Sequence, residues 1–100
     1  MIYRFLDKTG KMRKMNTETA TLLLCDRWRA GKDQTRWMEI YKTRQGQFVG
    51  IARSLWVGEA NGAFEMEESA VLQDLALAED HHRTIAGDTL LKERDPAVEI

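Results

Sequence analysis

The stretch RWMEIYKTRQGQFVGIAR, residues 36–53, predicts a β-hairpin, and this hairpin decides the fold. Apolar side chains flank the loop Arg44–Gly46, and three loop residues that end in glycine are typical of a type I turn with a G1 bulge. Because both faces carry apolar residues, we expect the hairpin to be central and partly covered on both sides. Gly50 leaves room for a large side chain from another element. The loop sets a register that pairs Tyr41 with Val49 on one face, and Lys42 with Phe48 and Ile40 with Gly50 on the other.

Upstream of this hairpin the sequence predicts further strands. Residues 2–6 alternate as a strand, Asp7–Gly10 supplies a turn, and residues 11–15 form a short return strand. Asn16–Ala20 has the chemistry of a helix start. Residues 20–29 fit either a helix or a strand, and we favour one helical turn at 17–20 followed by a strand.

Downstream, residues 67–79 predict the main helix, with an apolar stripe and glutamates near its N-terminus. We therefore expect an α+β fold: an antiparallel sheet of four or five strands with one main C-terminal helix packed on it. Residues 1–82 are expected to form a single domain. Residues 83–100 are expected to form a tail, and whether it is ordered, or adds a short strand or helical turn at 89–92, stays open. The predicted stripe contains Val71, Leu72, Leu75 and Ala78.

The composition is that of an ordinary globular domain, with 100 residues, 43% of them hydrophobic and 31% charged. No apolar run approaches the roughly 20 residues that cross a bilayer, and the first residues carry no signal-peptide pattern, so no membrane association is expected. The single cysteine, Cys25, cannot form an internal disulfide. These features favour a cytoplasmic location.

The net charge of −1 conceals a strong asymmetry along the chain. Residues 1–56 contain 12 Lys and Arg against 5 Asp and Glu, a net of +7. Residues 57–100 contain 3 against 11, a net of −8. Either the two halves neutralise each other on folding, which is the simpler interpretation, or a basic surface is left to meet an acidic partner.

The sequence offers no pattern typical of a catalytic, metal or cofactor site. His81-His82, with Asp80 and Cys25 as the other candidates, has no metal-ligand spacing, and adjacent residues on a helix point about 100° apart. We expect solvated histidines at a helix end and a small core cysteine. No phosphate-binding loop or nucleophile elbow is present. An enzyme is therefore not expected, and neither is a cofactor.

One basic and aromatic set is the candidate binding surface. Aromatic side chains interleaved with cations are typical of single-strand nucleic-acid binders, and tryptophan and arginine are also enriched in protein–protein hot spots. Burial of Trp28 and Trp37 in the core beneath an arginine-lined surface explains the same pattern. The set contains Arg27, Arg29, Arg36, Trp37, Lys42 and Arg44.

Two segments, Asn16–Ala20 (NTETA) and Tyr41–Phe48 (YKTRQGQF), resemble signatures of small uncharacterised proteins encoded by phages and integrative mobile elements. In that family an N-terminal hairpin leads into a Thr-Glu-Thr-Ala turn, a strand–turn–strand with a Tyr-Lys-Thr-x-x-Gly core and an acidic helix. The resemblance covers roughly residues 1–80. At residues 52–56 this chain has Ala-Arg-Ser-Leu-Trp, where family members often continue into a Gly-Gly-rich stretch. The resemblance implies a mobile-element accessory protein and no established activity.

We therefore expect a non-enzymatic protein–protein binder, most concretely an inhibitor of a host protein, such as a component of a nuclease-based defence system. Its acidic C-terminal half would engage a basic surface of that partner. The alternative is a nucleic-acid-binding accessory module that uses Arg27, Arg29, Lys42 and Arg44. A third hypothesis is a homo-oligomer in which the basic half of one copy meets the acidic half of another.

Overall fold

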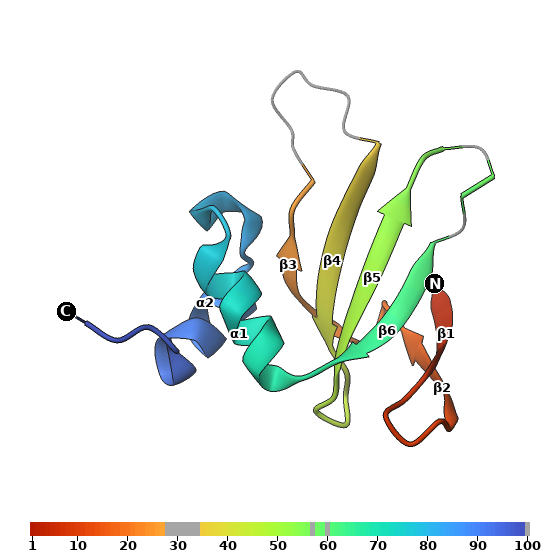
Figure 1. The fold of residues 1–100 in the computed structure, drawn as a ribbon, viewed down its shortest axis with the longest axis horizontal. Coiled ribbons are helices and arrows are strands. Elements are labelled where there is room, and N and C mark those ends of the chain that lie inside the picture. Colours follow the sequence, from red (N-terminus) through yellow and green to blue (C-terminus); the bar gives the residue numbers. More distant parts are fainter. Residues whose placement is uncertain (28–34, 57, 60, 100) are drawn as a thin grey trace.

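The computed structural model describes residues 1–27, 35–56, 58–59 and 61–99, and these residues form the α+β fold shown in Figure 1. Within these ranges the strands make two antiparallel sheets, a two-stranded sheet β1-β2 and a four-stranded sheet in the order β3-β4-β5-β6. The elements in chain order are β1 (Ile2–Leu6), β2 (Met12–Asn16), β3 (Thr21–Cys25), β4 (Arg36–Lys42), β5 (Phe48–Ser54), β6 (Gly62–Met66), α1 (Glu68–Leu77), the 3-10 helix η1 (Asp80–His82) and α2 (Ile85–Arg94).

The predicted α+β class is confirmed, but the prediction of one sheet with one main helix is wrong in two respects. The β1–β2 hairpin forms its own sheet, because its inward side chains Tyr3, Phe5 and Met15 are buried against one face of the larger sheet. A second helix, α2, follows η1 within the segment expected to be a tail and packs on β3 and α1. The division of the chain at residue 82 into domain and tail stays a prediction.

The central hairpin β4–β5 has the predicted register, with Tyr41 opposite Val49 and Ile40 opposite Gly50. Its turn is also confirmed, since Gly46 adopts a positive φ of 85° and its N–H donates to the carbonyl of Thr43 at 3.0 Å. A glycine tolerates this backbone conformation without steric cost. The loop chemistry therefore fixed which side chains share a face.

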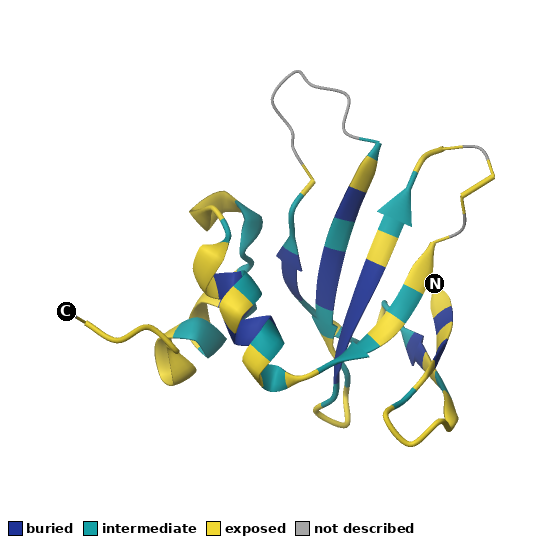
Figure 2. Ribbon diagram, viewed as in Figure 1, coloured by how far each residue is buried: buried dark blue, intermediate teal, exposed yellow. Residues whose placement is uncertain are grey.

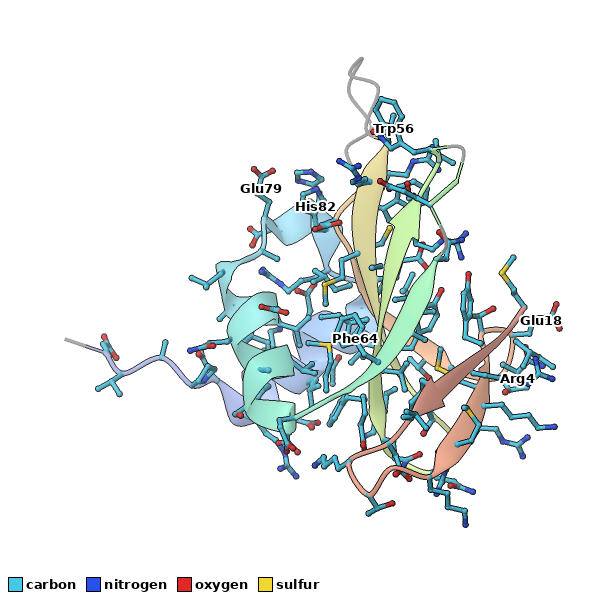
Figure 3. The ribbon with its side chains drawn as sticks, turned by 45° about the vertical axis from the view of Figure 1, so that its right-hand side comes forward. Arg4, Glu18, Trp56, Phe64, Glu79 and His82 are labelled. Carbon is cyan, nitrogen blue, oxygen red and sulfur yellow. The ribbon has the colours of Figure 1, made fainter. Side chains whose placement is uncertain are left out.

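Gly50 receives a large side chain from the neighbouring strand, as predicted. Phe64 of β6 lies opposite Gly50, on the side of the sheet that faces α1 (Figure 3). A Cβ atom at position 50 would come within 2.6 Å of the Phe64 ring and 2.9 Å of the Met66 sulfur. Only glycine allows this close approach.

The four-stranded sheet separates two hydrophobic clusters. Ile40 and Phe48 point toward the helices, where they pack with Leu23, Leu24, Val71 and Leu75. Val49 and Ile51 point to the other face, where they pack with Tyr3, Phe5 and Met15 of the β1–β2 hairpin. Figure 2 shows the buried residues concentrated on the middle strands, with exposed residues on the outer sides of the helices and hairpin.

Strand β3 explains why residues 20–29 fit two patterns. A bulge between Leu22 and Leu24 shifts the register with β4, so the consecutive residues Leu23 and Leu24 are both buried. The predicted turn followed by a strand is confirmed for residues 17–25, while residues 28 and 29 lie outside the described part of the chain.

Helix α1 confirms the predicted apolar stripe, with Val71, Leu72 and Leu75 buried. Helix α2 begins at an N-cap that the prediction missed: the hydroxyl of Thr84 accepts from the N–H of Gly87 at 3.1 Å and donates to the carbonyl of Leu22 at 2.6 Å. Both α-helices have ten residues, and no helix in the described ranges has the length and hydropathy of a membrane span.

Candidate binding surfaces

Most described basic residues lie on the β1–β2 hairpin and the strands, and most described acidic residues lie in the helical segment, while Lys8 of the β1–β2 turn contacts both Glu65 and Glu67. The β1–β2 hairpin covers one face and the helices cover the other (Figure 1). Among the described residues, two of eight ion pairs join residues 1–56 to residues 57–100: Lys8 with Glu67 at 2.7 Å, and Arg36 with Glu59. The other six pairs each join residues within one half, so the interpretation that the two halves neutralise each other on folding stays a prediction.

Two of the predicted binding residues, Arg27 and Trp37, come together on the face of the sheet that the β1–β2 hairpin covers. The Arg27 guanidinium carbon lies 4.2 Å from the centroid of the Trp37 ring, which is a cation–π contact. Trp37 is only 8% exposed, so its assignment to the core is confirmed. Trp28 and Arg29 lie outside the described residues.

The other predicted residues are dispersed. Arg36 points away from Trp37 because successive strand residues face opposite sides, and it forms two hydrogen bonds with Glu59, which help to lower the pKa of that carboxyl to about 2. Lys42 lies at the far end of β4, and Arg44 lies in the β4–β5 turn. The six predicted residues therefore do not form one continuous surface.

A buried carboxylate that the sequence analysis missed organises the Trp37 side of the sheet. Glu39 is 9% exposed and accepts hydrogen bonds from Trp37 Nε1 and from the Tyr41 hydroxyl, each at 2.8 Å. Arg53 lies 3.7 Å from the same carboxylate and donates to the Tyr3 hydroxyl, which connects the β1–β2 hairpin to the sheet. Burial and the contact with Glu39 raise the pKa of Tyr41 above its ordinary value. In the sequence, Trp37, Glu39 and Tyr41 alternate along one strand, so their side chains share a face. This alternation could have identified the cluster.

These contacts assign Glu39 a structural role. Its two oxygens receive an indole N–H and a phenol O–H, and a guanidinium balances its charge. These contacts fix the carboxylate in position. The cluster therefore joins Trp37, Tyr41 and Arg53 through one buried carboxylate.

A groove of about 420 Å³ runs between the β1–β2 hairpin and the β4–β5 turn. The charged residues that line it are all basic: Lys11, Arg13, Lys14 and Arg44. Arg13 bridges its two walls by donating to the side-chain oxygen of Gln45 at 2.9 Å, and lies 3.8 Å from Asp7. The groove is suited to an anionic group. Of its cations only Arg44 was predicted, although the run Lys11–Lys14 was a visible signal.

The outer face of the hairpin combines exposed apolar side chains with cations. Leu6 pairs with Met12 across the ladder, each 60% exposed, and Ile2 is 50% exposed on the same face. Between them Arg4 lies directly opposite Lys14, and Figure 3 shows Arg4 pointing away from the sheet. We call these five residues the hairpin face. Its two cations form no ion pair within the described ranges.

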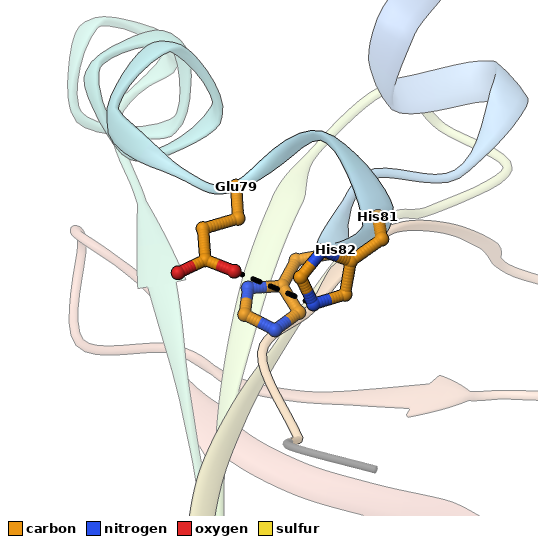
Figure 4. A group of neighbouring side chains, drawn as sticks. All are labelled: Glu79, His81 and His82. Carbon is orange, nitrogen blue, oxygen red and sulfur yellow. Dashed lines mark ion pairs between the residues drawn. The ribbon is translucent and has the colours of Figure 1, made fainter. Parts of the chain in front are cut away.

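The two histidines occupy a different position from the one expected. Helix α1 ends at Leu77, and His81 and His82 belong to the separate 3-10 helix η1. Their ring centroids are 4.2 Å apart, and Glu79 lies beside them (Figure 4). The expectation that the two adjacent histidines point apart is therefore wrong, because their rings lie in contact.

Cys25 is half-buried on the edge strand β3, so the prediction that it is a small core residue is wrong. It lines a groove of about 550 Å³ together with His81, His82 and Glu39. No hydrogen bond in the described structure joins Cys25 to either histidine, and Glu39 is committed to its own donors.

Comparisons of the chain with protein-family models, with curated proteins and with solved structures found no match. The resemblance of Asn16–Ala20 and Tyr41–Phe48 to phage and mobile-element proteins stays a prediction. The site is therefore interpreted from its own geometry.

Proposed function

We propose that this protein acts by binding an acidic protein partner through the hairpin face, and that it does so without catalysis. The observation that carries the proposal is which charged side chains form ion pairs on the β1–β2 hairpin and in the helical segment. Arg4 and Lys14, and Lys11 beside them, form no ion pair with any described residue. Of the carboxylates in residues 67–88, Glu67, Glu68, Asp80 and Asp88 form ion pairs with lysine or arginine.

The placement of Arg4 opposite Lys14 supports this proposal. Like charges that face each other across an antiparallel ladder destabilise it. Carboxylates of a partner would relieve this repulsion, so the same pair that costs stability in isolation would contribute affinity in a complex.

The exposed side chains of Ile2, Leu6 and Met12 favour a protein partner over a nucleic acid. Apolar side chains gain stability when they are removed from water, and a partner with apolar groups provides that burial. Aliphatic side chains provide no stacking platform, which is what single-strand binders use. The proposed partner surface is therefore acidic with interspersed apolar groups.

The mobile-element inhibitor expected from the sequence is one concrete form of this function. In that form the hairpin face would occupy an acidic surface of a host protein. This choice differs from the earlier expectation that the acidic C-terminal half makes the contact. We favour the hairpin because Arg4 and Lys14 face each other across its ladder without a carboxylate partner among the described residues and lie among exposed apolar side chains.

Nucleic-acid binding is the second candidate, and the basic groove is the observation that favours it. Lys11, Arg13, Lys14 and Arg44 line the groove without a carboxylate among the lining residues. Phosphates would fit this lining, and the affinity would then fall steeply with salt.

A titration followed by NMR on the ¹⁵N-labelled protein tests both candidates. The probes are an acidic peptide with interspersed leucines, polyglutamate of equal charge and a single-stranded oligonucleotide of equal charge. The proposal predicts that the leucine-containing peptide binds most tightly and shifts the amide signals of β1 and β2. Tightest binding by the oligonucleotide would support the groove and overturn the first proposal.

A second copy of the chain is a further acidic partner, and sedimentation over a range of concentrations tests it. Self-association that R4E and K14E abolish would identify the helices of a second copy as the partner. A monomer at every concentration leaves the peptide titration to decide between protein and nucleic acid.

A further inference from the structure

The segment Glu79–His82, between α1 and α2, gathers three side chains that can hold a metal ion. It forms the short helix η1, in which the N–H of His82 donates to the carbonyl of Glu79 at 2.9 Å. This tight turn places the carboxylate and both imidazoles on one side of the backbone (Figure 4). One ligand atom from each of the three residues lies within 4.8 Å of the others.

The spacing is close to that of a zinc site. Zn²⁺ binds nitrogen and oxygen ligands at about 2.0–2.2 Å in tetrahedral geometry, which places two ligand atoms about 3.3–3.5 Å apart. Glu79 Oε2 and His81 Nε2 are already 3.5 Å apart. A small side-chain rotation of His82 would complete a three-ligand arrangement with the fourth position open to water or to a partner's carboxylate.

His82 provides an independent indication of a ligand. Its Nε2 atom is buried and has no hydrogen-bond partner within the described structure. Buried polar atoms of native proteins nearly always have a partner, so each exception calls for an explanation. A metal ion bound at Nε2 would supply the partner that this atom lacks, because a neutral imidazole nitrogen is a common metal ligand.

The surroundings favour a cation. Asp26, Asp74 and Glu79 line a groove of about 410 Å³ that His82 also lines. Burial, together with the negative charge of Asp26, raises the pKa of Asp74. The adjacent cation, Arg83, is directed to Asp80 and Asp88 and to two carbonyls at the end of α1.

We infer that Glu79, His81 and His82 form a binding site for a divalent transition-metal ion of the zinc class. Two imidazoles with one carboxylate suit Zn²⁺, whereas Mg²⁺ and Ca²⁺ prefer oxygen ligands throughout. This site is separate from the hairpin face, and it would fix the connection between α1 and α2.

Titration with Zn²⁺ alone tests the inference, by calorimetry and by NMR of the imidazole nitrogens. The chain contains two histidines, so both sets of signals are assigned by single substitutions. The inference predicts one equivalent of Zn²⁺ that shifts both imidazoles, and about tenfold or greater loss of affinity in each of E79Q, H81A and H82A. The apo spectra of these variants verify that they are folded.

Cys25 provides the critical control, since it is the only cysteine and lines a groove with both histidines. C25S is expected to bind Zn²⁺ like the wild type. Loss of binding in C25S, unchanged binding in H82A or E79Q, or no saturable binding at millimolar Zn²⁺ would each overturn the inference.

Discussion

Arg4 lies directly opposite Lys14 in the β1–β2 ladder, on the side of the hairpin that faces away from the sheet. Neither cation is paired with a carboxylate among the described residues, and exposed apolar side chains flank them on the same face. A sequence selected for stability alone would place opposite charges here. Residues that function in binding often reduce stability in this way.

Charge reversal at Lys14 should therefore stabilise the free protein. In K14E a cross-strand repulsion with Arg4 becomes an attraction, and we expect the free energy of unfolding to rise by about 0.2–1 kcal/mol. Urea unfolding at low salt measures the change. K14Q is the control, because it removes the repulsion without adding an attraction and should therefore gain less stability than K14E. Equal stability of K14E and the wild type would contradict the interpretation of this pair.

Replacement of Gly50 by alanine should destabilise the protein strongly. The added Cβ would lie 2.6 Å from the Phe64 ring, and such overpacking costs about 1–3 kcal/mol. G62A is the control, because a Cβ at Gly62 has no heavy atom within 4 Å. Thermal unfolding compares the two variants. If G50A is as stable as G62A, or if F64A fails to rescue G50A, the close packing is not as described.

The register of the central hairpin could be predicted because it depends on neighbouring residues only. The three-residue loop before Gln47 and the alternation of apolar side chains determine which residues face each other. The same local logic identified α1. The position of the β1–β2 hairpin could not be predicted in this way. The apolar side chains of Tyr3 and Phe5 are equally compatible with an edge strand of the main sheet and with a second layer packed on that sheet.

The candidate site was predicted less well than the fold, for two physical reasons. Neighbouring strand residues point to opposite faces, so Arg36 and Trp37 are adjacent in sequence and separated in space. The bulge at Leu23 removes the alternation on which the assignment of residues 20–29 depended. The Arg27–Trp37 contact was the part of the predicted set that the fold brought together.

Glu39 should be essential for stability. In E39Q the carboxamide offers one acceptor oxygen, and its NH₂ group would face the Trp37 N–H or the Tyr41 O–H. A buried donor left without an acceptor costs about 1–3 kcal/mol, and we expect a loss of that size in the free energy of unfolding. E93Q, on the exposed side of α2, is the control and should change stability by less than about 0.5 kcal/mol. An unchanged E39Q variant would show that the cluster is not structurally required.

Deprotonation of Tyr41 should lower the free energy of unfolding at alkaline pH. Burial and the hydrogen bond to Glu39 raise its pKa above the ordinary value of 10.0. A raised pKa means that the folded state holds the proton more tightly, so this contribution is complete below pH 10.0 and is lost as pH rises above it. Denaturant unfolding between neutral pH and the alkaline limit should give a shallower decline for Y41F than for the wild type. Parallel declines would show that another group causes the loss.

A charge-swap measurement tests the central claim most directly. The double variant R4E/K14E reverses the cations of the hairpin face, and K92E reverses an exposed lysine on α2 as the control. Each is titrated with the leucine-containing acidic peptide and with its lysine counterpart. The account predicts that R4E/K14E loses the acidic peptide and gains the basic one, while K92E behaves as the wild type. If R4E/K14E and the wild type bind both peptides with equal affinity, the hairpin face is not the binding surface.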